Sequence, residues 1–276
     1  MDLIYGNFKK NVEWFLSSQV SVLDENLFSW KGRTLSYCLP SGMDDYPRAP
    51  ILTDQEAHLD LQSWMIISTR TLARVATILG KAEDAVAYKL RQTKIEANLN
   101  ANFWDESRQL YDDWYLDETG NKQFVGHTGY LNFFPFFLNV IPQEYNERFM
   151  STFEKLIDPA TGLWSEFGVR SLSIYDPYYR LGDDYWTSPI WMNINYLIWL
   201  SLHQYETSAT VDHTLKVQIT SARIQLRMNL VNMIVSQYVN TGFIWEVYDD
   251  LTGDGLDNHP FTGWSALVVN ILAERY

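Results

Sequence analysis

Residues 41–50 read SGMDDYPRAP and place two aspartates, Asp44 and Asp45, side by side between a Gly and a Pro. The simplest explanation is a turn, because Asp and Gly tolerate turn conformations and Pro fixes the backbone. The functional explanation is that one of the two carboxyl groups donates a proton, with its pKa raised by the like charge of its neighbour. These residues alone leave both explanations open.

Three charged residues follow this stretch, namely Arg48, Glu56 and Asp60. Glu56 and Asp60 are four residues apart, so within one helix they would share a face. The pattern Thr53-x-x-Glu56 also fits a capping box, which would give Glu56 a purely structural role. Asp60 has no such explanation, and Arg48 is the natural partner for one of these acids.

A second acidic stretch, FIWEVYDD (243–250), sets Glu246 among aromatic residues. A carboxylate in such surroundings is either a surface feature or a buried acid that faces a ligand. Glycoside hydrolysis needs two carboxyl groups, one that protonates the leaving oxygen and one that activates water or attacks carbon. The two acidic stretches offer carboxyl groups of the kind that such a pair needs, and the residues alone do not decide whether they face each other. The residues after FIWEVYDD lack the Glu that would complete an EF-hand loop, so calcium is not predicted.

Composition limits the classes of partner. The 276 residues carry a net charge of −13, which argues against nucleic acid and against an anionic membrane surface. Aromatic residues make up 15% of the chain, with eleven Trp and seventeen Tyr. Trp and Tyr combine a flat apolar face with a polar edge, as carbohydrate binding requires, although a helical core rich in aromatic residues explains the composition at least as well.

Other chemistries lack their motifs. The five His residues are isolated, Cys38 is the only cysteine, and neither a nucleophile elbow nor a phosphate-binding loop is present. These patterns predict no metal site. The N-terminus has no apolar core of signal-peptide length, and the longest apolar stretches, 130–141 and 189–202, are shorter than the roughly 20 residues that span a bilayer. No membrane contact is therefore expected from this chain itself.

Hydrophobic periodicity predicts a helical protein with one small hairpin at 107–126. The predicted helices cover 5–19, 53–80, 82–104, 127–140, 143–157, 189–206, 209–239 and 265–276. Two long loops, 158–186 and 241–264, are rich in Trp, Tyr, Asp and Glu. Polar and aromatic residues on loops above a helical scaffold usually form a functional site.

Seven motifs then identify a resemblance. In chain order they are SGMDDYPRA, EAHLDLQSW, GYLNFFPFFL, LWSEFGVRSLS, YWTSPIWMNINYL, TGFIWEVYDDLTGDG and HPFTGWSALVV. Together they resemble the C-terminal catalytic domain of glycoside hydrolase family 63, the family of processing α-glucosidase I (mannosyl-oligosaccharide glucosidase). The resemblance runs over nearly the whole chain, from NFKKNVEWF to LAERY.

The resemblance implies an all-α (α/α)6 toroid. About eight helices are predicted where a full toroid has twelve, so we expect residues 1–276 to form an incomplete catalytic domain without the first barrel helices and the N-terminal β-sandwich. The resemblance also implies an activity: inverting hydrolysis, without a cofactor, that removes the terminal α-1,2-linked glucose from the triglucosylated N-glycan precursor in the endoplasmic reticulum. The implied partners are the glucosylated oligosaccharide and the missing N-terminal portion.

Site residues follow from the same motifs. Asp44 resembles the general acid, in agreement with a comparable Ser-Gly-aromatic-Asp stretch in trehalases, and Asp45 raises its pKa or holds the turn. Glu246 resembles the general base, and for inversion the two carboxyl groups should lie about 6.5–9.5 Å apart. Glu56 and Asp60 match acidic positions of the family site. The remaining candidate sugar contacts are Arg48, Trp186, Trp191, Trp245 and Trp264.

One motif departs from the family pattern: Thr187 and Ser188 stand where the family usually has Arg-Gly after Tyr-Trp. Two alternatives to the processing enzyme also stay open. The chain could be a non-catalytic, glycan-binding or scaffolding remnant, or it could hydrolyse small α-glucosides.

Overall fold

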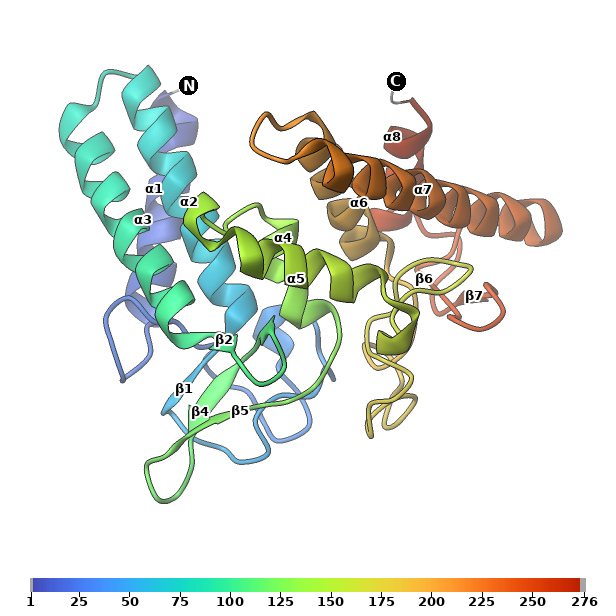
Figure 1. The fold of residues 1–276 in the computed structure, drawn as a ribbon, viewed down its shortest axis with the longest axis horizontal. Coiled ribbons are helices and arrows are strands. Elements are labelled where there is room, and N and C mark those ends of the chain that lie inside the picture. The colour runs from blue at the N-terminus through green and yellow to red at the C-terminus, as the bar shows by residue number, and fades with distance from the viewer. Residues whose placement is uncertain (1, 274–276) are drawn as a thin grey trace. The chain divides into compact units, whose positions relative to one another are not determined.

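The computed structural model describes residues 2–273 (Figure 1). The chain divides into two compact units. The N-terminal unit runs to His127 and includes Leu131–Thr152, and the C-terminal unit holds Thr128–Tyr130 and the chain from Phe153 on. Eight α-helices and seven short strands occur within the described residues, which confirms the predicted helical class with a small amount of β-structure.

Three long helices carry the N-terminal unit: α1 (Asp2–Ser18), α2 (Leu59–Ile78) and α3 (Ala82–Asn102). Their periodicity predicted all three. Helices α2 and α3 form a hairpin that turns at Gly80, whose φ of +70° is a conformation that glycine adopts without strain. Side chains join α1 to α3: Tyr5 and Lys9 both donate to the Asp84 carboxylate at 2.7 Å, and Tyr88 donates to Glu13.

Short strands precede α2 and follow α3. They are β1 (Glu56–Ala57), β2 (Trp104–Asp105), β3 (Leu110–Tyr111), β4 (Trp114–Leu116) and β5 (Lys122–Phe124). The predicted hairpin is present as the antiparallel pair β4–β5, and β1 pairs with the other side of β4. The capping-box prediction is wrong, because Glu56 lies in a strand opposite Tyr115 and α2 begins only at Leu59.

The predicted helix 127–140 is mostly absent. Its place is taken by a 3-10 turn at Tyr130–Phe133 and the single turn α4 (Phe134–Phe137). Pro135 has no N–H to donate and cannot continue a helix from the residues before it, which explains the break. Helix α5 (Asn146–Ile157) follows after another 3-10 turn.

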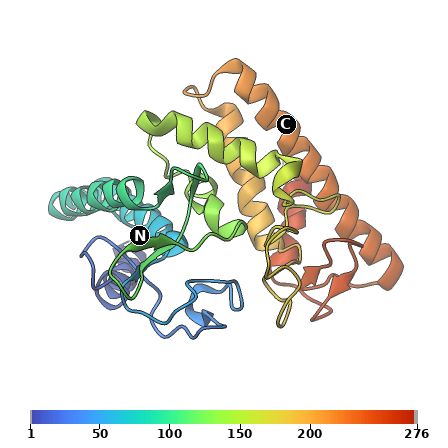
Figure 2. The same cartoon turned by 60° about the horizontal axis from the view of Figure 1, so that its bottom comes forward.

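The C-terminal unit is built on α6 (Met192–Thr207), α7 (His213–Thr241) and the short α8 (Val268–Ala273). Figure 2 shows α7 as the long orange helix beside α6. Asp212 caps α7 by accepting from the backbone N–H of Leu215, and Gly242, with φ of +79°, ends the helix.

The last predicted helix, 265–276, corresponds to α8 and the 3-10 turn before it, and its end at 274–276 lies outside the described residues. Strands β6 (Val247–Tyr248) and β7 (Gly255–Leu256) form a small hairpin between α7 and this segment.

Gly168 lets the loop 158–186 approach the helices of the C-terminal unit. Its φ is +152°, and a Cβ there would lie 2.9 Å from Ile190 and 3.0 Å from both Asn195 and Leu230. Gly182 has a φ of +70° with no atom within 4 Å of the same position. Both positions have a φ that L residues rarely adopt, and only Gly168 also lacks space for a Cβ.

We expect Gly168→Ala to lower the free energy of unfolding by about 2–4 kcal/mol, because strain at a positive φ and overpacking add. Gly182→Ala, which has the strain alone, should cost about 1 kcal/mol. Urea denaturation measures both, and equal losses in the two variants would contradict the packing explanation.

Candidate active site

Asp44 lies in a turn and also has the environment of an acid. The stretch begins with a 3-10 turn that ends at Gly42, and the backbone oxygen of Asp44 accepts from the N–H of Cys38 at 2.7 Å. The side chain is half-buried, and no hydrogen bond from a described residue reaches its carboxyl group. Burial, and then the charge of Asp45, raise the pKa of Asp44. Asp44 therefore both takes part in a turn and has the raised pKa that a proton donor needs.

Arg48 pairs with two buried acids in the N-terminal unit. Its guanidinium contacts Asp60 at 2.7 Å and Asp113 at 2.8 Å. Burial alone would raise the pKa of Asp60, but the charge and hydrogen bonds of Arg48 hold it below its usual range. Trp30 donates its indole N–H to Asp60, and Asp113 accepts the backbone N–H of Leu59 at the start of α2. The predicted partnership of Arg48 with one of the acids is confirmed. Asp113 was not predicted, and only the adjacent pair Asp112–Asp113 hinted at it.

Glu56 has an arginine of its own. Arg33 donates Nε at 2.7 Å to one carboxylate oxygen and a terminal nitrogen at 2.6 Å to the other. Burial opposes ionisation, but hydrogen bonds and charge from His58 and Arg33 lower the pKa of Glu56 to about 2. The predicted shared helical face of Glu56 and Asp60 is absent, since Glu56 lies in β1 and Asp60 in the first turn of α2.

Glu246 is buried in the C-terminal unit, with 5% of its surface exposed. The Tyr185 hydroxyl donates to Oε1 at 2.8 Å. The side-chain amide of Asn258 donates to Oε2 in a short hydrogen bond, and its backbone N–H donates to the same oxygen at 3.4 Å. Trp264 donates its indole N–H to the backbone oxygen of Glu246 at 2.7 Å. None of the residues that the structure describes forms an ion pair with Glu246.

Aromatic rings gather beside this carboxylate. Trp186 and Trp191 stack with centroids 3.7 Å apart and planes 7° apart, and Trp264 lies 5.6 Å from Trp191. Tyr185 meets Trp191 edge-on at 4.7 Å. Three of the four predicted tryptophans therefore cluster with Glu246. The fourth, Trp245, packs on His259 at 3.8 Å.

Two arginines on the loop 158–186 hold it against the β6–β7 hairpin. Arg170 contacts the buried Asp250 at 2.5 Å, and Arg180 contacts both Asp250 and Asp249. Tyr179 adds a hydrogen bond to Asp250 at 2.7 Å. This network, the arginine–aspartate clamp, connects the loop that carries Tyr185 and Trp186 to the hairpin that follows Glu246. The acidic pair of FIWEVYDD is thus structural.

Comparison with known proteins decides the family. The family model described as the glycosyl hydrolase family 63 C-terminal domain matches residues 1–274. The chain belongs to glycoside hydrolase family 63.

Relatives agree with this assignment. A probable mannosyl-oligosaccharide glucosidase of Schizosaccharomyces pombe is 39% identical over 97% of this chain, and a mannosyl-oligosaccharide glucosidase of Saccharomyces cerevisiae is 33% identical over 98%. The chain spans about a third (34%) of the length of each. The solved family 63 mannosylglycerate hydrolase of Thermus thermophilus, in complex with glucose, aligns with a TM-score of 0.57 at 20% identity, over 79% of this chain and 48% of that one. This likeness concerns the fold and confirms the predicted helical toroid class.

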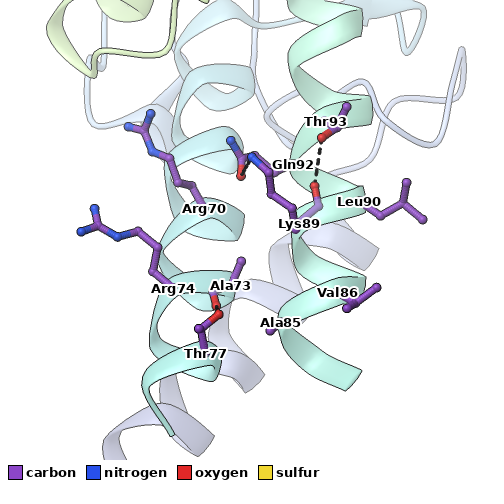
Figure 3. Close-up of a pocket in the computed structure, with 10 residues that line it drawn as sticks. All are labelled: Arg70, Ala73, Arg74, Thr77, Ala85, Val86, Lys89, Leu90, Gln92 and Thr93. Carbon is purple, nitrogen blue, oxygen red and sulfur yellow. Dashed lines mark hydrogen bonds between the residues drawn. The ribbon is translucent and has the colours of Figure 1, made fainter. Parts of the chain in front are cut away.

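The family 63 chain also has an open groove between α2 and α3 (Figure 3). Arg70 and Arg74 on α2 project along one side of it, and Val86 and Leu90 lie on α3. None of the ten residues that line it is a carboxylic acid. The groove therefore lacks the groups that glycoside hydrolysis needs, and the acids described above remain the candidates.

Neither a metal cluster nor a membrane-spanning helix occurs in the part of the chain that the structure describes. Residues 2–273 contain no group of three or more His, Cys, Asp or Glu side chains arranged to hold a metal ion. Within the same range, no helix has both the length and the apolar character needed to cross a membrane.

The Arg48 network makes a prediction about stability. Arg48→Met should lower the free energy of unfolding by about 3–5 kcal/mol, because Asp60 and Asp113 would stay buried without a countercharge. Lys9→Met, which breaks the partly exposed pair with Asp84, should cost less than about 1 kcal/mol. Urea unfolding at pH 7 measures the free energy of unfolding of both variants. Similar losses in the two would show that the buried Arg48 network contributes no more to stability than a partly exposed ion pair.

Proposed function

We propose that this family 63 chain carries the catalytic acids of an inverting α-glucosidase that removes the terminal α-1,2-linked glucose from the triglucosylated N-glycan precursor. The observation that carries the proposal is the setting of Glu246, buried without a cation partner beside stacked tryptophans in a chain of this family. Relatives named mannosyl-oligosaccharide glucosidases, similar over nearly all of this chain, support the substrate class.

In this proposal Asp44 is the general acid and Glu246 the general base. Asp44 transfers its proton to the glycosidic oxygen as the bond from that oxygen to the anomeric carbon breaks. Glu246 takes a proton from a water molecule, whose oxygen attacks the anomeric carbon from the opposite face. The raised pKa of Asp44 supports its part, because a general acid must keep its proton near neutral pH.

The other predicted site residues have different surroundings. Trp186, Trp191 and Trp264 offer ring surface and indole edges close to Glu246, and we propose that this cluster contacts the sugar. The other residues that we propose for substrate binding are Asp45, Arg48, Glu56, Asp60 and Trp245. Among these, Arg48, Glu56 and Asp60 are committed to buried ion pairs, which suits a role in holding the acidic stretch.

The proposed compartment and partners follow from the family resemblance. We propose the lumen or membrane of the endoplasmic reticulum, with a glucosylated oligosaccharide as substrate and no nucleic acid. We also propose that the chain associates with the N-terminal portion that the family resemblance implies.

Glucose release tests the proposal. The chain is incubated with the triglucosylated glycan and with an α-1,2-linked glucosyl disaccharide. Glu246→Gln and Asp44→Asn should each lose at least about 10²–10⁴-fold in kcat, the usual contribution of general acid–base catalysis. Glu154→Gln, an exposed control on α5, should match the wild type. Release from the disaccharide alone would favour a hydrolase of small α-glucosides, and no release by a folded wild-type chain would favour a non-catalytic remnant.

Asp45 should set the alkaline limit of activity. Its charge contributes to the raised pKa of Asp44, so Asp45→Asn should lower that pKa and move the alkaline limb of the kcat/KM profile to lower pH. The acid limb should stay in place. A pH–rate profile measures both limbs, and an alkaline limb that does not move, or moves upward, would show that Asp45 does not act on Asp44 through its charge.

A further inference from the structure

The two oxygens of the Glu246 carboxylate have different surroundings. We infer that Oε1 is the oxygen that takes the proton from water, and that Tyr185 and Asn258 are positioning residues that present it. This inference rests on the proposed function, since it assigns the atom that performs the general-base step.

Asn258 occupies Oε2. Each carboxylate oxygen offers about two lone-pair sites. Both donors of Asn258, its side-chain amide and its backbone N–H, reach Oε2. That oxygen therefore has no lone pair left for a water molecule.

The backbone fixes where these two donors lie. The N–H of Glu246 donates to the backbone oxygen of Asn258 at 3.0 Å, next to the β6–β7 pairing of Val247 with Leu256. Asn258 thus meets Glu246 in a register set by the hairpin. The hairpin therefore fixes the side of the carboxylate that Asn258 occupies, and the oxygen on the other side is the one called Oε1 here.

Tyr185 leaves Oε1 half free. Its hydroxyl is the one donor among the described residues that reaches this oxygen, so one lone pair remains for water. Tyr185 itself is well fixed, because its ring meets Trp191 edge-on and its backbone oxygen accepts the Trp191 indole N–H at 2.8 Å. The free lone pair therefore has a defined direction beside the tryptophan cluster.

Neutral donors suit this role. Tyr185 holds Oε1 with a single hydrogen bond. An arginine would instead occupy the carboxylate in a fork-shaped contact, as Arg33 does at Glu56. The phenol therefore fixes Oε1 and leaves one lone pair for water.

The test compares Tyr185→Phe with Tyr179→Phe in the active chain. Both changes remove one phenol–carboxylate hydrogen bond from the same loop and keep the ring, but Tyr179 contacts Asp250. We expect Tyr185→Phe to lower kcat about 10- to 100-fold with KM unchanged, as for a lost hydrogen bond to a charged group. Tyr179→Phe should keep the wild-type kcat and KM.

Asn258→Ala provides a second variant that keeps the backbone N–H. It should also lower kcat, by less than Glu246→Gln does. The inference is overturned if Tyr185→Phe keeps the wild-type kcat, if its loss appears only in KM, or if Tyr179→Phe shows the same loss of kcat. A fully active Glu246→Gln variant, or an inactive wild type, would instead overturn the proposed function and this inference with it.

Discussion

A buried carboxylate must be compensated, and the kind of compensation divides the acids of this protein into two groups. Asp60 and Asp113 share Arg48, Glu56 has Arg33, and Asp250 has Arg170 and Arg180. Desolvation makes an unpaired buried charge very unfavourable, so the folded state requires these arginines as countercharges. Glu246 is just as buried but is held by a phenol and an amide. An acid held by neutral donors is not engaged in an ion pair, and one lone pair of its Oε1 stays available to water.

The ion pairs also place the segments that carry the proposed chemistry. Arg48 lies four residues after Asp44 and connects that turn to the start of α2 through Asp60 and to Asp113 beside β4. In the C-terminal unit, the arginine–aspartate clamp holds the loop of Tyr185 and Trp186 to the hairpin. Neither segment has enough regular secondary structure to fix its own position. Charged contacts between residues distant in sequence therefore fix the positions of these segments, as backbone hydrogen bonds fix the conformation of the helices.

Local patterns predicted what local forces determine. The periodicity of α1, α2 and α3, the turn at Gly80 and the β4–β5 hairpin depend on nearby residues, and the sequence predicted them. Thr53-x-x-Glu56 failed because Glu56 bonds to Arg33, 23 residues earlier, which no local pattern encodes. The helix at 127–140 failed because Pro135 interrupts an apolar run that otherwise looked helical. The sequence did not predict that Tyr185 and Asn258 bind Glu246, because they lie 61 and 12 residues away from it in the chain.

The central claim is that Glu246 activates water for a single displacement at the anomeric carbon. Proton NMR of the sugar anomers, recorded within the first minutes of hydrolysis of an α-1,2-linked glucosyl substrate, tests it most directly. Direct attack by water from the opposite face produces β-glucose first, with α-glucose appearing later through mutarotation. If α-glucose appeared first, the reaction would proceed through a covalent glycosyl-enzyme, and a base that acts only on water could not explain it.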